Sequence, residues 1–402
     1  MNRFFDRWSA VSEGSWLLAL TFALLVTAAY VPFWGFFSLQ PFVAIALVIF
    51  FVNKFYRGYG FNAKTSSLLL AMLFVVNVIV SELPAKSITA MVSMTKGLLL
   101  FYPAVVAGYF LAGRPELQTK IVKLYFLANL AFALWVYVAV LDRDNFFESL
   151  LLWSNHHLGN MHNFNNFLFF SLLAGVVGLS ASKTWMEKSL FVIASGFVAY
   201  LCLLAKSEGA VYGLVMTGLF YGLFFSAKKY RPLFAIAILG WILLLIYIYV
   251  NPGVVSVLSG YEGGSLQARS EIFSNVFQAL DGNLLFGLGV GTFRYIPEVA
   301  VNGENFIHPH NIYLEILYSF GLVGVLVLAF VFWSAARRIE LPLLKSQQVC
   351  VLLFLMLVYY SAKGMSDIKL LYQPSMSFYA IAIGFLVGAT QFLKKGAEPG
   401  VR

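Results

Sequence analysis

The sequence predicts an all-α membrane protein with about twelve transmembrane helices and one large loop on the outer side of the membrane. Three observations support this fold class. Of the 402 residues, 60% are hydrophobic and only 11% are charged, whereas roughly a quarter of the residues in a soluble chain are charged. The apolar residues form runs long enough to cross a bilayer as helices. The basic residues gather in alternate connections between these runs.

Each predicted span is an apolar run of up to about 20 residues or slightly more, because a bilayer core needs roughly 20 helical residues. The first run is not followed by the cleavage site of a signal peptide, so we expect it to remain as a helix. No internal repeat or soluble second domain interrupts the series, so residues 1–402 are predicted to form a single membrane domain. The predicted spans are 15–33, 38–53, 66–81, 89–111, 122–141, 164–181, 189–205, 209–227, 232–251, 312–335, 347–361 and 373–392.

The basic residues predict the orientation. With the N-terminus inside, 19 of the 27 basic residues fall in inside segments, seven fall outside and Lys96 falls within a span. Lys and Arg disfavour export of short loops, so both termini are expected to be cytoplasmic. The net charge of +9 then reflects cytoplasmic anchoring, and nucleic acid is not an expected partner. The seven outside cations are Lys86, Arg143, Lys206, Arg269, Arg294, Lys363 and Lys369.

Residues 252–311 form the longest connection, and it lies on the outer side in this orientation. Connections of this length are usually functional. Within it, apolar residues recur at helical spacing over 265–281, which predicts an amphipathic helix at the membrane interface. Arg269 lies on the apolar side of that helix. Its guanidinium is expected either to meet a lipid headgroup or to face an anionic substrate.

Alternating glycines follow at Gly287, Gly289 and Gly291. They suggest either a phosphate-binding loop or a tight backbone turn. No nucleotide-fold helix comes after them, which favours the turn.

The segment His308-Pro309-His310-Asn311 precedes the span at 312–335. Asn311 is a good helix cap, so the helix should begin near His310 or Asn311. His310 would then lie at the positive end of a transmembrane helix. An imidazole exchanges a proton near neutral pH and suits acid–base catalysis. Capping or contact with headgroups is the structural alternative.

The five histidines all fall on the outer side in this orientation. A cluster of three could hold a metal ion, but the surrounding asparagines favour contacts with sugars or headgroups. We therefore predict no metal site and no cofactor. The three are His156, His157 and His162.

Residues 308–315, with Gly321 and Gly324, resemble the signature of the O-antigen ligase superfamily, and so does the arginine-bearing helix followed by 285–293. Lys96 and the pair Ser366-Asp367 are weaker matches. The superfamily includes lipid A-core:surface-polymer ligases, O-antigen polymerases and some protein O-oligosaccharyltransferases. The resemblance implies a GT-C-like glycosyltransferase of the bacterial inner membrane. Such an enzyme moves a glycan from undecaprenyl diphosphate to an acceptor hydroxyl on the periplasmic side.

In this resemblance, His310 corresponds to the family's histidine and Arg269 to its arginine in the loop helix. One departure concerns Glu208, which stands where the family usually has arginine. Lys206, two residues earlier, would supply a positive charge without the bidentate fork of arginine.

The expected function is O-antigen ligation to a lipid A-core hydroxyl, inverting and without a metal. His310 is the candidate general base and His308 the second candidate. A diphosphate leaving group needs positive charge, for which the candidates are Arg269, Lys206, Arg294 and Lys96. Further substrate contacts are expected from His308, Asn311 and Glu315. The alternatives are an O-antigen polymerase, a polysaccharide transporter or flippase, and a structural anchor in the membrane.

Overall fold

A computed structural model describes residues 63–81, 83–98, 100–140, 146–158, 161–205, 208–250, 264–295, 308–365 and 373–397, and all regular structure in these ranges is helical. The longer helices are α3 (Ala63–Val80), α4 (Pro84–Leu98), α5 (Phe101–Ala112), α6 (Pro115–Val140), α7 (Phe146–Leu158), α8 (Met161–Ala181), α9 (Trp185–Leu204), α10 (Glu208–Phe225), α11 (Arg231–Val250), α13 (Gly264–Ala279), α14 (Ile312–Ala336), α16 (Gln348–Lys363) and α17 (Gln373–Ala397). Short turns of helix are η3 (Lys228–Tyr230), η4 (Phe293–Tyr295) and α15 (Leu341–Leu344).

Most predicted spans within the described residues coincide with one helix to within a few residues. The span predicted at 89–111 is wrong as a single helix, because α4 ends at Leu98 and α5 begins at Phe101. Pro103 lies in the first turn of α5, where its missing N–H costs no helical hydrogen bond. Helix α7 lies in a segment that the sequence analysis treated as an outer connection. The spans at 15–33 and 38–53 lie outside the described residues, so the count of twelve remains a prediction.

Five of the described helices are long and apolar enough to cross a membrane: α6, α14, and the segments Phe164–Ala181, Trp185–Leu204 and Ser375–Gly396. The apolar parts of α3, α10 and α16 are shorter. The protein is therefore a helical membrane protein, as the composition predicts.

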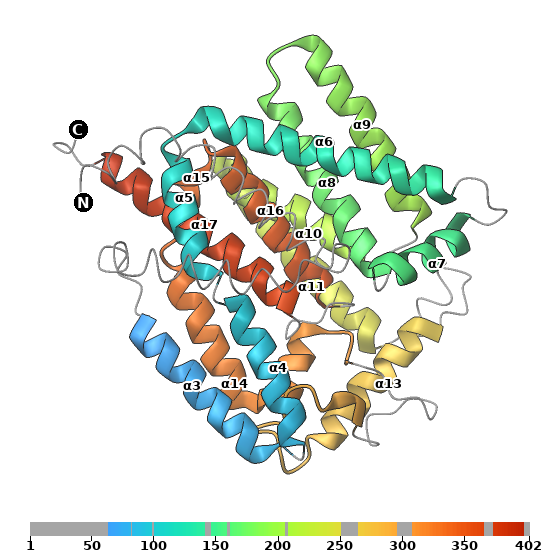
Figure 1. Cartoon of the computed structure of the whole chain (residues 1–402), viewed down its shortest axis with the longest axis vertical. Helices are drawn as coiled ribbons and strands as arrows, with labels where there is room; N and C mark the ends of the chain where they lie inside the picture. Colours follow the sequence, from blue (N-terminus) through green and yellow to red (C-terminus); the bar gives the residue numbers. More distant parts are fainter. Residues whose placement is uncertain are drawn as a thin grey trace.

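Helix α17 lies at the centre of the described part and is buried over most of its length. Figure 1 shows α3, α4 and α14 grouped at one end of the molecule and α6, α8 and α9 at the other, with α16 and α17 between them. Gly384 and Gly388 let α17 approach α5 closely, because a Cβ at either position would collide with the carbonyl of Phe101 or Val105. Small residues allow such close contacts between membrane helices.

The outward faces of the helices are apolar. On α3, Leu68, Met72, Val75 and Ile79 are exposed. These positions share one face at helical spacing, and the opposite face is buried. An exposed apolar stripe of this kind is what a lipid-facing helix requires.

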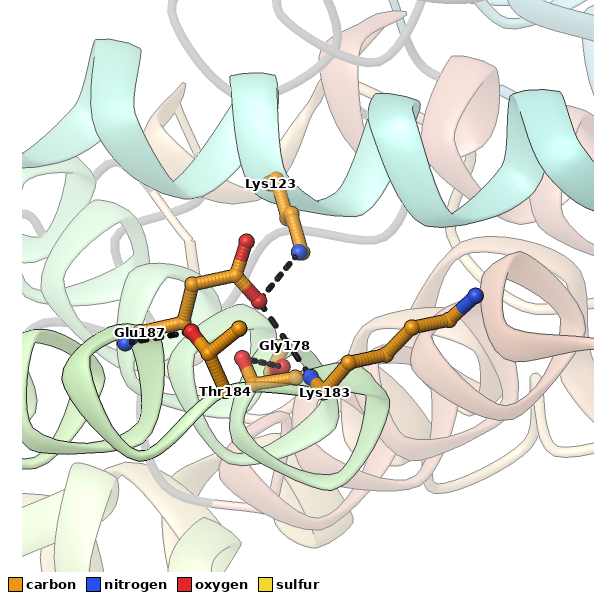
Figure 2. Close-up of polar contacts among 6 residues, drawn as sticks. Lys123, Gly178, Lys183, Thr184 and Glu187 are labelled. Atoms are coloured by element: carbon orange, nitrogen blue, oxygen red, sulfur yellow. Dashed lines mark hydrogen bonds and ion pairs between the residues drawn. The ribbon is translucent and has the colours of Figure 1, made fainter.

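Polar contacts join the helix ends that the sequence analysis assigned to the cytoplasmic side. Figure 2 shows Lys123 on α6 with its Nζ 3.0 Å from Oε2 of Glu187, in the first turn of α9. Thr184 caps α9 by accepting a hydrogen bond from the Glu187 N–H. At another pair of ends, Lys345 Nζ donates to the Phe225 carbonyl at 3.1 Å. These two basic residues thus bond to the ends of neighbouring helices.

Candidate functional site

Helix α14 is broken at Gly321, which has φ 62° and ψ −166°. A β-carbon there would collide with the backbone of Leu285. The N–H groups of Leu322 and Val323, just after the break, donate to the carbonyls of Leu284 at 2.9 Å and Leu285 at 3.1 Å. Non-helical backbone within a membrane is tolerated where other protein groups satisfy it. The segment 282–292 does so here.

The same segment supplies the tight turns that the alternating glycines predict. Gly287 has φ +74° and Gly289 has φ +103°. The Leu288 and Gly289 N–H groups donate to the carbonyls of Tyr318 and Ser319 on α14, at 2.8 and 3.2 Å. These two N–H groups already donate to carbonyls of α14, so they do not point toward a phosphate. The structure therefore supports the interpretation as a backbone turn and not as a phosphate loop.

Asn77 of α3 joins residues 282–292, here called the glycine segment, to the broken helix α14. Its Nδ2 donates to the Ser319 carbonyl at 2.6 Å, and its Oδ1 accepts from the Val290 N–H at 3.0 Å. Ser87 Oγ of α4 donates to the Val290 carbonyl at 3.0 Å. All four residues are buried. Sequence analysis missed Asn77, although a single amide within an apolar span is a signal of a specific polar contact.

Helix α13 agrees with the amphipathic helix predicted at 265–281. Ile272, Val276 and Leu280 share one buried cluster with Leu314 and Tyr318 of α14. Arg269 is half-buried and lies about one turn before Ile272. His310 likewise lies about one turn before Leu314. The elements that carry Arg269 and His310 thus pack together.

His310 occupies an unusual backbone conformation at the start of α14. Its φ is +53°, a backbone angle that residues other than glycine rarely adopt. Its N–H donates to Nδ1 of His308 at 3.1 Å. The two imidazole rings lie with centroids 4.2 Å apart and planes 33° apart. Both side chains are half-buried, so they border the protein surface at this end of the helix.

Asn311 caps α14, as predicted. Its Oδ1 accepts from the N–H groups of Tyr313 and Leu314, at 2.9 and 3.0 Å. Its Nδ2 donates to the Met365 carbonyl at 2.9 Å. One N–H of the amide therefore remains for a substrate, and both lone pairs of the oxygen are used. The Ile312 N–H also donates to the Gly364 carbonyl at 2.8 Å, so the end of α16 fixes the start of α14.

Lys363, next to Gly364, was counted from the sequence only as an outer cation. Its side chain is fully buried, and Nζ donates to Asn166 Oδ1 of α8 at 2.9 Å. A charged group in a membrane protein interior is costly without such partners. Asn166 is one of the asparagines near the three histidines for which the sequence favoured contacts with sugars or headgroups, whereas it is a buried residue of α8. Lys363 directly precedes Gly364, whose carbonyl bonds the start of α14, and the sequence analysis did not single it out.

The other predicted residues are placed as follows. Lys96 is exposed in the last turn of α4. The first turn of α4, which contains Lys86, is the end that meets the glycine segment, and Lys96 lies about 15 Å farther along the helix. Glu315 is half-buried in the first turn of α14. Arg294 is part of η4, but its side chain is outside the described set, and Lys206 lies outside the described residues. The side chains of His156, His157 and His162 are also outside it. Among the side chains that are described, no three His, Cys, Asp or Glu residues are grouped to hold a metal ion.

These features define a class of protein: a helical membrane protein in which a helix-bearing loop packs on a broken transmembrane helix, with a histidine pair at the start of that helix. Residues 190–329 match the family model described as O-Antigen ligase. The match runs from α9 into α14 and includes Arg269, His308, His310, Asn311 and Glu315. The comparison with curated proteins gave no match. The family match confirms the resemblance to the O-antigen ligase superfamily and supports a function of the O-antigen ligase or polymerase type.

Proposed function

We propose that this chain is a GT-C-like glycosyltransferase that transfers a glycan from undecaprenyl diphosphate to a hydroxyl of lipid A-core. In this proposal it acts at the periplasmic face of the bacterial inner membrane, with both termini in the cytoplasm. The observation that carries the proposal is the turn at His308–Asn311. It holds an imidazole at the start of α14, on the helix against which α13, bearing Arg269, packs.

The chemistry is direct displacement at the anomeric carbon. The acceptor oxygen forms a bond to that carbon while its proton passes to the imidazole of His310. The bond between the anomeric carbon and the diphosphate oxygen breaks, and undecaprenyl diphosphate leaves with the electron pair. The configuration at the anomeric carbon is inverted, and the mechanism uses no metal.

Positive charge has to accompany the departing diphosphate, because charge develops on its oxygen as the bond breaks. Arg269 fills this role in our proposal, with Lys206 and Arg294 as further contacts from the outer segments. The N-terminus of α14 adds a favourable field for an anion. Lys96 is the weakest of the proposed contacts, because it is exposed at the other end of α4.

The direct test uses purified protein in detergent with lipid-linked glycan as donor and lipid A-core as acceptor. We expect the wild-type chain to form glycosylated lipid A-core, and to do so in the presence of EDTA. Leu326→Val is a matched control for variants at the start of α14, because Leu326 is on the same helix and 70% exposed. Absence of any product from folded protein would contradict the proposed reaction.

A polymerase, which joins one lipid-linked glycan to another, is the second candidate because the family match fits both reactions. The lipopolysaccharide of a deletion strain separates them. Unligated polymer retained on its lipid carrier indicates a ligase, and core capped with a single repeat indicates a polymerase. A transporter or flippase would give no transfer product in detergent.

The proposed orientation has its own test. Asp281→Cys, an exposed position after α13, should react in intact cells with a thiol reagent that does not cross the inner membrane. Lys345→Cys, exposed near the end of α10, should react only after the membrane is opened. Both variants are made in a background with Cys202 and Cys350 replaced. The reverse labelling pattern would invert the orientation and move His310 to the cytosolic side.

A further inference from the structure

The two histidines at the start of α14 occupy different chemical positions. Among the described residues, His310 is the one non-glycine residue with a positive φ. A side chain in this region of backbone conformation is strained, and the strain persists only where surrounding contacts enforce it. The hydrogen bonds around residues 308–312 hold the positive φ of His310, and one of them comes from His308.

The residues after His310 are fixed by α16. Asn311 Nδ2 donates to Met365 O, and the Ile312 N–H donates to Gly364 O. Before His310, the buried Pro309 has a ring that restricts φ and carries no N–H. The His310 backbone itself donates its N–H to the acceptor nitrogen of His308 at 3.1 Å. A side-chain acceptor at one position thus bonds the N–H two residues later, as Asn and Asp do in Asx turns.

This hydrogen bond also assigns the protons of the His308 ring. A neutral imidazole has one nitrogen that donates and one that accepts. Because Nδ1 of His308 accepts from the backbone, its proton is on Nε2. The neutral ring then has no second lone pair for a substrate proton, and protonation at Nδ1 would remove the acceptor that holds the turn. His310 uses its backbone, not its ring nitrogens, in this contact.

We propose that His308 is a positioning residue: its Nδ1 lone pair holds the backbone of His310 in the left-handed conformation and so aims the catalytic imidazole at the acceptor hydroxyl. The inference rests on the proposed function of His310 as the base. It removes His308 from the candidates for proton transfer. The tilted contact between the two rings, with centroids 4.2 Å and planes 33° apart, adds a second contact that orients the His310 side chain.

Two substitutions separate positioning from chemistry. His308→Asn keeps an acceptor that can bond the N–H two residues later, but it cannot exchange a proton at neutral pH. His308→Phe keeps a flat ring that can stack on His310, but it has no acceptor. We expect His308→Asn to retain kcat within about threefold of wild type and His308→Phe to lose on the order of 10- to 100-fold, because a misplacement of about 1 Å in a catalytic group has effects of that size. The KM values for both substrates should change by less than about threefold, since binding is not the function removed.

A measurement that does not depend on activity accompanies the kinetics. Amide hydrogen exchange of the peptide that contains residues 308–314 should be faster in His308→Phe and unchanged in His308→Asn. If both variants lose activity equally, His308 contributes chemistry or substrate contact, and the proposal is overturned. If both retain activity and protection, the turn needs no acceptor, and the proposal is also overturned.

The proposed function fails separately from this inference. If His310→Gln is fully active, His310 is not the base, and the rescue of amide protection by His308→Asn still reports whether His308 holds the turn. All variants are compared as monodisperse protein, with Leu326→Val as the control for the helix.

Discussion

Replacing Asn77 by Leu is expected to destabilise the contact between the glycine segment and the broken helix α14. Leucine has the same number of side-chain heavy atoms as asparagine, branched at the same carbon, so the substitution removes hydrogen bonds without creating a cavity. The buried Val290 N–H loses the Asn77 oxygen that accepts from it. The Ser319 carbonyl loses the Asn77 amide but keeps the Gly289 N–H at 3.2 Å.

Leaving one buried donor unsatisfied costs about 1–3 kcal/mol, and loss of a second hydrogen bond adds roughly 1 kcal/mol. The total is about 2–4 kcal/mol. Because the entropy of unfolding is about 2.1 cal/mol/K per residue, this corresponds to a fall in the unfolding midpoint of roughly 2–5 °C for a chain of this size. Thermal unfolding in detergent, followed by intrinsic fluorescence, measures the shift. Ile79→Val, on the exposed face of the same helix, should change stability by less than about 0.5 kcal/mol. If Asn77→Leu behaves like this control, the bonds to Ser319 and Val290 do not stabilise the fold.

Three further substitutions test neighbouring parts of the account. Gly321→Ala adds a β-carbon that collides with the Leu285 carbonyl, at a residue whose positive φ disfavours side chains. Little monodisperse protein should therefore be recovered, and a normal yield would contradict the break in α14. Asn166→Leu removes the oxygen that accepts from Lys363 Nζ and should lower stability by about 2 kcal/mol, because hydrogen bonds to charged groups contribute about 1.5–3 kcal/mol; an unchanged midpoint would refute this. Arg269→Lys keeps the charge but loses the bidentate fork, so KM for the lipid-linked donor should rise about tenfold, equivalent to about 1.4 kcal/mol, and an unchanged KM would argue against contact with the diphosphate.

Much of the helical pattern could be predicted from the sequence, because the apolar runs are long and their boundaries carry clear signals. The start of α14 at Asn311 and the extent of α13 follow from a capping residue and from apolar spacing, both of which act locally. The division of the 89–111 run was missed because α4 and α5 are both apolar and only a short turn separates them. Helix α7 was missed because its composition is mixed and, at 13 residues, it is too short to stand out as a membrane span.

The candidate site could be predicted only in part. The motif around His310 and the arginine of α13 are visible as residue types in sequence. The contact of His308 with the His310 backbone, the bonds of Asn77 and the burial of Lys363 depend on long-range packing or on one backbone angle. Spacing alone cannot specify these features. A lone Asn or Lys within an apolar run, or at its end, nevertheless indicates a specific polar contact. Burying such a group costs free energy unless a hydrogen-bond or charge partner accompanies it.

The central claim is that His310 removes the proton from the acceptor hydroxyl. The most direct measurement is the single-turnover rate of glycan transfer by purified His310→Gln, with donor and acceptor both saturating. General-base catalysis contributes about 10²–10⁴-fold, so the account predicts a fall of at least about 100-fold with unchanged donor binding. A transfer rate equal to that of Leu326→Val would contradict it.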